Sequence, residues 1–307
     1  MQLITDFSTC VSGPCVATIG FFDGVHRGHR YLIDQVKAVA ESRGLSSAVL
    51  TFSAHPGKVI RPDRVPGLLT TTREKIGLLE QSGIDACFLI GFTSQLSRME
   101  ASEFMEKILY EKLHVRSLLI GHDHRFGYNR ADAFDDYQHM GQRLGIEVLP
   151  ALSYMYEGVP ISSSLVRNSL LEGRVEDAHR YLGYPYSIQG RVVGGYQIGR
   201  TLGFPTANLQ LSDSEKLLPV SGVYAVYVYT GTDRYKGMLN IGHRPTIGSG
   251  NASSIEVHLL HFSGDLYDCP LRVEFVHRLR SEVRFQDRSL LIRQLEQDAM
   301  CVEELLS

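Results

Sequence analysis

The ten residues "GFFDGVHRGH", 20–29, separate a strand-like run from a helix-like run, and this junction decides the fold of the first half. The preceding "CVATIGF", 15–21, is apolar and predicts a buried strand. The following "HRYLIDQVKAVAESRG", 29–44, has the spacing of an amphipathic helix that ends at Gly44. A strand that turns into a helix in this way is the opening unit of an α/β fold.

The same alternation continues through the first half of the chain. Strand-like runs are expected at 46–52, 85–92, 116–123 and 146–152, and helical runs at 73–83, 101–113 and 135–145. Strict alternation of strand and helix predicts a parallel sheet with helices on both faces. Ligands of such sheets bind at the carboxyl ends of the strands, where Asp23, His26 and His29 are expected to lie.

The second half of the chain has a different pattern, rich in Val, Ile and Tyr and interrupted by turn residues. Strands are expected at 186–193, 222–230, 235–242, 254–262 and 271–279. Their spacing is typical of a small barrel or sandwich, and a final helix over 288–306 is expected to cover one opening or edge. We place the boundary at 183–187, which predicts domains over 1–183 and 184–307.

Length, charge and cysteine content limit the class of protein. At 307 residues the chain has room for two domains. Its 31 Lys and Arg against 34 Asp and Glu give a formal charge of -3, which argues against a surface that coats nucleic acid. Five cysteines without paired metal spacing predict reduced thiols or small buried residues. With no secretory signal or membrane-spanning run, we expect a cytoplasmic protein without membrane or nucleic-acid partners.

Two histidines at the start of the expected first helix, which begins around Gly28, are the first candidate site. A helix N-terminus attracts phosphate, and His26 and His29 share a face there. Imidazoles can stabilise charge on phosphoryl oxygens, and Gly24 and Gly28 leave room for close approach. A metal pair or ordinary surface histidines are the alternatives; a zinc site needs further ligands, and His55 could approach in space.

The segment "ISSSLVRNSLLEGRV", 161–175, is the second candidate. Ser162, Ser163 and Ser164 precede Arg167, whose guanidinium can grip phosphate through two parallel hydrogen bonds. A serine N-cap on a helix explains the same pattern without a ligand, and taken alone it is the simpler interpretation.

Together, "FFDGVHRGH" and "ISSSLVR" resemble the paired motifs with which nucleotidyltransferases related to class I aminoacyl-tRNA synthetases bracket ATP. Further motifs are "TFSAHP", "LTTTREKIGLLEQSGID", "IGHDHRFG", "LGFPTAN" and "RLRSEVRF". The ordered set resembles the prokaryotic bifunctional riboflavin kinase/FMN adenylyltransferase (FAD synthetase) family over nearly the whole chain. The resemblance implies an N-terminal Rossmann-like nucleotidyltransferase domain with a parallel sheet, and a C-terminal small antiparallel β-barrel with a terminal helix.

The resemblance also implies roles in adenylyl transfer. His26, His29 and Arg167 are expected to act on the phosphates of ATP, and no strong base is needed because the attacking FMN phosphate is already an anion. Further ATP contacts are expected at Gly20, Phe21, Asp23, Gly24, Gly28, Ser162, Ser163 and Ser164. In "IGHDHRFG", Asp123 and Arg125 resemble a flavin-binding segment, although His124 stands where the family has Phe and a turn is the alternative for Asp123.

In the second half, "GFPTAN" is the candidate phosphate site. Thr206 and Asn208 share a face in extended backbone and offer neutral oxygens to Mg²⁺. An ordinary polar turn is the alternative from the residues alone. In riboflavin kinases, which the segment resembles, it binds magnesium and ATP phosphates, so ATP contacts are also expected at Gly203 and Pro205. "GGYQIGRT", 194–201, nearly fits a P-loop, but Pro205 forbids the regular helix that such a loop opens.

Glu256 in "SSIEVHLL" is the candidate base of the kinase. The attacking group is the neutral ribityl hydroxyl of riboflavin, so a carboxylate that accepts its proton is useful. The polar face of an alternating strand is the alternative, and the resemblance favours the base. Arg280 and Glu282 in "RLRSEVRF" resemble a flavin-binding segment, with a solvated charged stretch as the alternative.

The expected activity is therefore twofold. The C-terminal barrel phosphorylates riboflavin with MgATP to give FMN, and the N-terminal domain adenylylates FMN to give FAD and pyrophosphate. Two other functions stay open. One is a nucleotidyltransferase for another phosphorylated acceptor, in which Glu256→Gln leaves the main activity intact; the other is a flavin carrier or sensor, which turnover of ATP would exclude.

Overall fold

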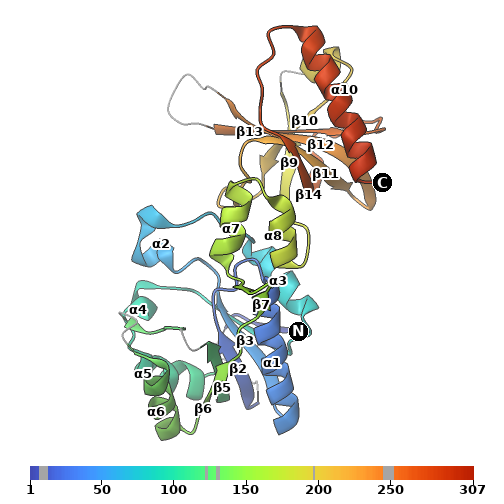
Figure 1. Cartoon of the computed structure of the whole chain (residues 1–307). Helices are drawn as coiled ribbons and strands as arrows, with labels where there is room; N and C mark the ends of the chain where they lie inside the picture. Colours follow the sequence, from blue (N-terminus) through green and yellow to red (C-terminus); the bar gives the residue numbers. More distant parts are fainter. Residues whose placement is uncertain (7–12, 122–123, 129–131, 196–197, 245–251) are drawn as a thin grey trace. The chain divides into compact units, whose positions relative to one another are not determined.

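The computed structural model describes residues 1–307 apart from 7–12, 122–123, 129–131, 196–197 and 245–251. Contacts divide the chain into two compact units, Met1–Ser162 and Ser163–Ser307. Each unit is built on one main sheet, and Figure 1 labels many of the elements of both. Within the described ranges, no helix has both the length and the apolar character needed to cross a membrane.

The first unit contains a six-stranded sheet with the order β1-β4-β3-β2-β5-β6, in which all neighbours are parallel. The strands are β1 (Gln2–Ile4), β2 (Cys15–Ile19), β3 (Ser46–Phe52), β4 (Ala86–Ile90), β5 (Val115–Gly121) and β6 (Glu147–Ala151). The expected parallel sheet is confirmed, and β1 is an addition too short to show a periodicity. Because β3 and β5 lie on opposite sides of β2, the edge after β2 is a topological switch point.

Alternating side chains of the strands enter two separate cores, so helices cover both faces of the sheet. On β2, Val16 joins the core that contains Ile33 of α1, whereas Ala17 joins the core that contains Tyr137 of α6. The helices are α1 (Arg27–Arg43) and α3 (Thr72–Gln81) on one face, and α5 (Ala101–Phe104), η2 (Met105–Tyr110) and α6 (Phe134–Leu144) on the other. This arrangement confirms the expected three layers.

The run 101–113, expected as one regular helix, differs in the structure. It starts as α5 and widens into the π-type helix η2, because Glu111 donates its N–H to the carbonyl of Glu106, five residues earlier. Other short elements could not be read from the hydrophobic period: α2 (Gly57–Ile60), η1 (Pro62–Arg64), α4 (Ser94–Ser97), β7 (Met155–Tyr156) and β8 (Val159–Pro160).

The second unit contains a closed antiparallel barrel with the strand order β10-β13-β12-β11-β14-β9. Its elements are α7 (Ser163–Leu171), α8 (Val175–Leu182), β9 (Ser187–Val193), α9 (Ile198–Thr201), β10 (Ala207–Leu211), β11 (Gly222–Thr230), β12 (Asp233–Arg244), β13 (Ala252–Leu259), β14 (Pro270–Arg280) and α10 (Arg288–Leu305). Val302 of α10 packs against Ala225 and Met238 of the barrel. Of the two expected architectures, the barrel with a terminal helix is confirmed.

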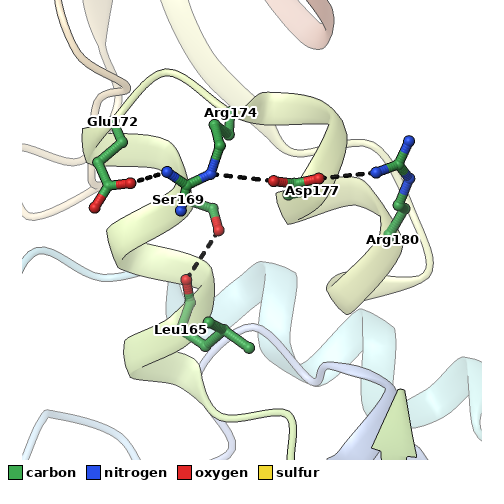
Figure 2. A network of polar contacts seen from close by, with 6 residues as sticks. All are labelled: Leu165, Ser169, Glu172, Arg174, Asp177 and Arg180. Carbon is green, nitrogen blue, oxygen red and sulfur yellow. Dashed lines mark hydrogen bonds and ion pairs between the residues drawn. The ribbon is translucent and has the colours of Figure 1, made fainter. Parts of the chain in front are cut away.

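Helices α7 and α8 form part of the barrel unit. Figure 2 shows the ion pairs at their junction, where Asp177 accepts from Arg174 at 3.1 Å and from Arg180 at 2.9 Å. Glu176 of α8 lies 3.0 Å from Nδ1 of His277 on β14. By contacts these helices therefore belong with the barrel, although they precede the predicted boundary at 183.

Candidate functional sites

The turn after β2 carries the histidine motif. Helix α1 begins at Arg27, close to the expected start at Gly28, and His26 is its N-cap. The His26 Nδ1 accepts a hydrogen bond from the backbone N–H of His29 at 3.2 Å. Because this N–H occupies Nδ1, the neutral ring of His26 carries its proton on Nε2.

The imidazole rings of His26 and His29 stack on each other. Their centroids are 3.6 Å apart with 16° between the planes, and the ring of Phe22 lies 4.9 Å from that of His29. Burial lowers the pKa of His29 well below its usual value, and the charges of His26 and Lys75 act in the same direction. The Nδ1 of His29 is buried and has no hydrogen-bond partner in the described part of the chain. Negative charge from a nearby phosphate would stabilise the protonated form of such a ring, and a phosphate oxygen could form a hydrogen bond with its unpaired nitrogen.

The backbone of this turn is strained. Phe22, Gly24 and Val25 have φ angles of 55°, 80° and 34°. Glycine adopts this region without strain, but a β-branched residue such as Val25 does so only when its surroundings hold it there. The side chains of Phe22 and Val25 are buried, which supplies part of that hold.

Hydrogen bonds to Asp23 also fix the backbone of this turn. Its buried carboxylate accepts hydrogen bonds from the backbone N–H groups of Leu69 and Thr70, both at 3.0 Å, and from the Thr70 hydroxyl at 3.1 Å. The same hydroxyl accepts from the N–H of Gly24 at 3.0 Å. The structure therefore gives Asp23 an anchoring role, and its contact with ATP stays a prediction.

The other residues predicted to contact ATP in the first unit surround the same turn. A Cβ added at Gly28 would make a tight contact of 3.2 Å with the His26 ring, and one at Gly20 would lie 2.9 Å from the Phe22 ring and force that ring to shift. The Nδ1 of His55 accepts from the N–H of Gly57 at 3.0 Å. No group of three or more His, Cys, Asp or Glu is placed to hold a metal among the described residues, so the metal alternative gains no support there.

The serine segment falls at the border of the two compact units. Ser162 ends the first unit, whereas Ser163 and Ser164 open α7 and Arg167 lies one turn further along it. Phosphate binding by Ser162, Ser163, Ser164 and Arg167 stays a prediction, as does the alternative of a serine N-cap on α7.

The predicted flavin residues of the first unit are only partly described. Asp123 lies outside the described residues. The Nη1 of Arg125 donates to the carbonyl of its neighbour His124 at 2.9 Å. The His124 ring lies 6.1 Å from the Phe126 ring, which stacks on Tyr137 at 4.2 Å, so an aromatic cluster is present beside this segment.

The barrel brings the predicted kinase residues together. Asn208 of β10 is the cross-strand partner of Glu256 on β13, and Asn240 of β12 is its partner on the other side. Directly paired residues share a face of a sheet, as do Thr206 and Asn208 two apart. The hydroxyl of Thr206 donates to Oε2 of Glu256 at 3.4 Å. A carboxylate is thus flanked by oxygen-bearing side chains from both neighbouring strands.

A cavity of about 430 Å³ opens beside Glu256. Its walls come from the loop before β10, from the barrel strands and from the first half of α10, which contributes Leu291 and Leu295. Thr206, Glu256, Arg280 and Glu282 line it, as do the apolar side chains Phe204 and Met238. Apolar walls with a few polar groups are typical of a site for a planar organic ligand.

The loop that precedes β10 is held against the cavity. The Nδ1 of His258 on β13 lies 2.7 Å from the carbonyl oxygen of Pro205, and the His258 ring meets that of Phe204 edge to face at 5.3 Å. Gly203 has φ of 84°, which favours glycine. The loop thus presents Thr206 to Glu256, a contact that the sequence did not predict, and the predicted binding of magnesium and ATP phosphates by "GFPTAN" stays a prediction.

Arg280 is fixed to the terminal helix rather than free in the cavity. Its Nε lies 3.1 and 3.0 Å from the two carboxylate oxygens of Asp298, and its Nη2 lies 2.8 Å from Oδ2. Asp298 is 4% exposed and also accepts from Gln294 at 2.9 Å. Arg280 therefore forms a rigid wall beside the predicted flavin site.

The variant Asp298→Asn tests whether the fixed position of Arg280 matters for riboflavin binding. Removing one charge of a buried pair costs about 3 kcal/mol or more and releases the guanidinium. We expect the KM for riboflavin to rise at least about tenfold in the kinase assay, with adenylyl transfer to supplied FMN unchanged. An unaltered KM in a variant with a clearly lower melting temperature would limit the pair to a purely stabilising role.

Comparison with known families separates the two halves of the chain. The family model for FAD synthetase matches residues 9–165, and the model for riboflavin kinase matches residues 182–306. A bifunctional riboflavin kinase/FMN adenylyltransferase from Pseudomonas fluorescens is 38% identical over 95% of this chain and 93% of its own length. The chain belongs to the bifunctional riboflavin kinase/FMN adenylyltransferase family.

Other members of the bifunctional riboflavin kinase/FMN adenylyltransferase family cover the chain equally well. The Escherichia coli K12 protein is 37% identical over 99% of this chain and 97% of its own length, and the Bacillus subtilis protein is 35% identical over 92% and 90%. A solved structure described as a macrolide-efflux protein from Streptococcus pneumoniae shares the fold, with a TM-score of 0.87 over 98% of each chain at 28% identity.

Four polar residues of these sites were not singled out from the sequence. Lys75 lies on the buried face of α3 together with Leu79, where a lysine among apolar positions was the available signal. Asn240 interrupts the apolar strand "YKGMLNIG" in the same way. His258 and Asp298 gave no signal, because their partners are brought to them by tertiary structure.

Proposed function

We propose that the chain makes FAD from riboflavin in two ATP-dependent steps, with riboflavin phosphorylated in the barrel cavity and FMN adenylylated at the histidine turn. The observation that carries the proposal is that Glu256 and Thr206 line one cavity and Asn208 pairs with Glu256 across the strands, whereas the His26–His29 stack lies in another compact unit. Family membership of both halves supports two separate activities. ATP, riboflavin, FMN, FAD and pyrophosphate are then substrates and products.

In the kinase step, Glu256 is the general base. Its carboxylate accepts the proton of the terminal ribityl hydroxyl while that oxygen forms a bond to the γ-phosphorus of ATP and the bond to ADP breaks. The cavity walls exclude water from the attacking oxygen, and the fixed Arg280 guanidinium and Glu282 border the flavin. Water exclusion matters because it limits hydrolysis of ATP.

The oxygen groups beside Glu256 fit a magnesium ion. Thr206 offers a hydroxyl and Asn208 a carboxamide on the same face as the carboxylate, which are hard donors of the kind Mg²⁺ accepts alongside phosphate oxygens. We propose that Thr206 and Asn208 hold the ion together with the ATP phosphates. The ion would neutralise charge on those phosphates.

In the adenylyl transfer step, the phosphate oxygen of FMN attacks the α-phosphorus of ATP and pyrophosphate leaves. No base is required, since the FMN phosphate is already ionised. His26 donates from Nε2, the start of α1 adds the positive end of its helix dipole, and His29 adds a hydrogen bond or a positive charge as negative charge grows on the leaving group. Arg167 and the serines of 162–164 are proposed to close on the phosphates.

The functional boundary is proposed at 183, with adenylyl transfer over 1–183 and kinase activity over 184–307. It is supported by the family matches, which end at 165 and begin at 182. A cytoplasmic location is proposed because both steps consume ATP, and the four described cysteines, which carry no disulfide, are compatible with it.

Chromatography of riboflavin incubated with MgATP and the full chain tests the function. We expect FMN to appear first and FAD to follow. Supplied FMN should yield FAD and pyrophosphate without passing through riboflavin. Accumulation of ADP without any flavin product, or adenylylation of other phosphorylated acceptors in preference to FMN, would contradict the proposal.

A further inference from the structure

Lys75 of α3 is a buried lysine at the edge of the sheet that carries the histidine turn. Its side chain is 2% exposed. The Nζ donates to the carbonyl oxygens of Phe21 at 3.1 Å and Phe52 at 2.7 Å, and to the Thr51 hydroxyl at 3.2 Å. The ammonium also lies 4.2 Å from the centre of the Phe21 ring. One cation therefore joins Phe21, two residues after the end of β2, to the end of β3.

The three N–H groups of this ammonium are matched by three acceptor oxygens within the protein. An ammonium has no further donor with which to bind a phosphate. Lys75 therefore does not contact ATP in this arrangement, and any effect on the reaction passes through the groups that it holds.

The groups that Lys75 holds determine the shape of the phosphate-binding turn. Phe21 precedes the residues with positive φ, Phe22, Gly24 and Val25, whose strain persists only while surrounding contacts fix it. Asp23 fixes the middle of this turn from the segment at 69–70, and Lys75 fixes its start from α3. We infer that Lys75 is a positioning residue for adenylyl transfer, which keeps the His26–His29 stack in the geometry that receives the triphosphate. This inference rests on the proposed assignment of adenylyl transfer to that turn.

The electrostatic surroundings make the positioning sensitive to pH. Burial lowers the pKa of Lys75 to about 8, although the carboxylate of Asp23 acts in the opposite direction. Burial raises the pKa of the Cys87 thiol to about 11, so it stays neutral where Lys75 titrates. His29 of α1 faces the same charge and is neutral there. On its own helix, Glu74 caps Thr71 and Arg73 is exposed.

The direction of the pH effect on adenylyl transfer follows from the lowered pKa of Lys75. Below pH 8 the ammonium is charged and holds both carbonyls; above it, the neutral amine binds them more weakly. In adenylyl transfer, kcat/KM for ATP should therefore fall as pH rises through about 8, which gives the pH–rate profile a descending limb. The pH–rate profile of riboflavin phosphorylation by the same chain should lack this descending limb.

The test uses the full chain with Lys75→Gln, Lys75→Arg and the matched control Lys37→Gln. Lys37 donates to the carbonyl of Ser82 at 2.7 Å, at the other end of α3 from the turn. We expect Lys75→Gln to lower kcat/KM for ATP in FAD formation by about 100-fold, because small displacements of positioned groups cost that much. Lys75→Arg should retain more activity and lose the limb near pH 8, whereas Lys37→Gln should match the wild type.

Two results with the Lys75 variants would overturn the positioning role of Lys75. Normal FAD formation by Lys75→Gln, or a limb near pH 8 that survives in both Lys75 variants, would overturn it. If the variants fail to fold, the wild-type profile and ¹³C NMR of labelled lysine side chains decide, and the absence of a lysine titrating between about pH 7 and 9 would overturn it. Full FAD formation by His29→Ala would instead refute the proposed adenylyl-transfer site. That result is distinct from the outcomes that overturn the role of Lys75.

Discussion

Glu256→Gln should abolish the formation of FMN from riboflavin while leaving the conversion of supplied FMN to FAD intact. Gln keeps the size and the oxygen that faces Thr206, but it cannot accept the proton of the ribityl hydroxyl. The expected loss in kcat is about 1,000-fold, in the range that general bases contribute. The measurement is the initial rate of each step, with riboflavin and with FMN as the supplied flavin.

Glu296→Gln is the matched control for this prediction. Glu296 is an exposed residue of α10 outside the cavity lining, so its replacement should change neither rate. If Glu256→Gln still phosphorylated riboflavin, the general base would be another residue. Glu256 would then only be part of the polar face of β13. Loss of both steps in a folded variant would contradict the separation of the two sites.

His29→Ala should show the converse behaviour, with riboflavin phosphorylated to FMN at the normal rate and FAD almost absent. Removing one group that stabilises developing charge costs about 100- to 1,000-fold in kcat. The assay follows FAD from supplied FMN and MgATP. His139→Ala, an exposed histidine on α6, is the control and should behave as the wild type.

Stability provides an independent readout for the same variant. Because the pKa of His29 is lowered in the fold, the unfolded chain binds its proton first as pH falls below the usual value of 6.5. The free energy of unfolding should therefore decrease with falling pH in that range and stay constant above it. His29→Ala should remove this contribution to the slope in thermal unfolding between pH 7 and 5. An unchanged slope would contradict the lowered pKa of His29.

The sequence predicted the elements whose hydrophobic period is long and clear. The strands at 46–52 and 222–230 occupy those residues in the structure, as β3 and β11, because strands buried on both faces appear in the sequence as short continuous apolar runs. The three-residue β1 and the π-type η2 left no such mark. Their existence depends on pairing and packing with distant residues.

The candidate sites were predictable to the extent that their residues are close in sequence. His26 and His29, or Thr206 and Asn208, can be placed on one face from their spacing. Tertiary partnerships could not be read in this way. The tie between Arg280 and Asp298 joins β14 to α10, and the hold of Lys75 on two strand ends joins α3 to β2 and β3.

The joint between β10 and β13 has a consequence for the barrel as a whole. Within the described residues this joint consists of Ala207 opposite Val257 and Asn208 opposite Glu256, whereas β11 and β12 pair from Gly222 to Thr230. The ring of strands is therefore closed there by two residue pairs, one of which joins Asn208, proposed to hold magnesium, to Glu256, proposed to accept the proton. Loss of this short joint would expose the edges of β10 and β13 to pairing with neighbouring chains.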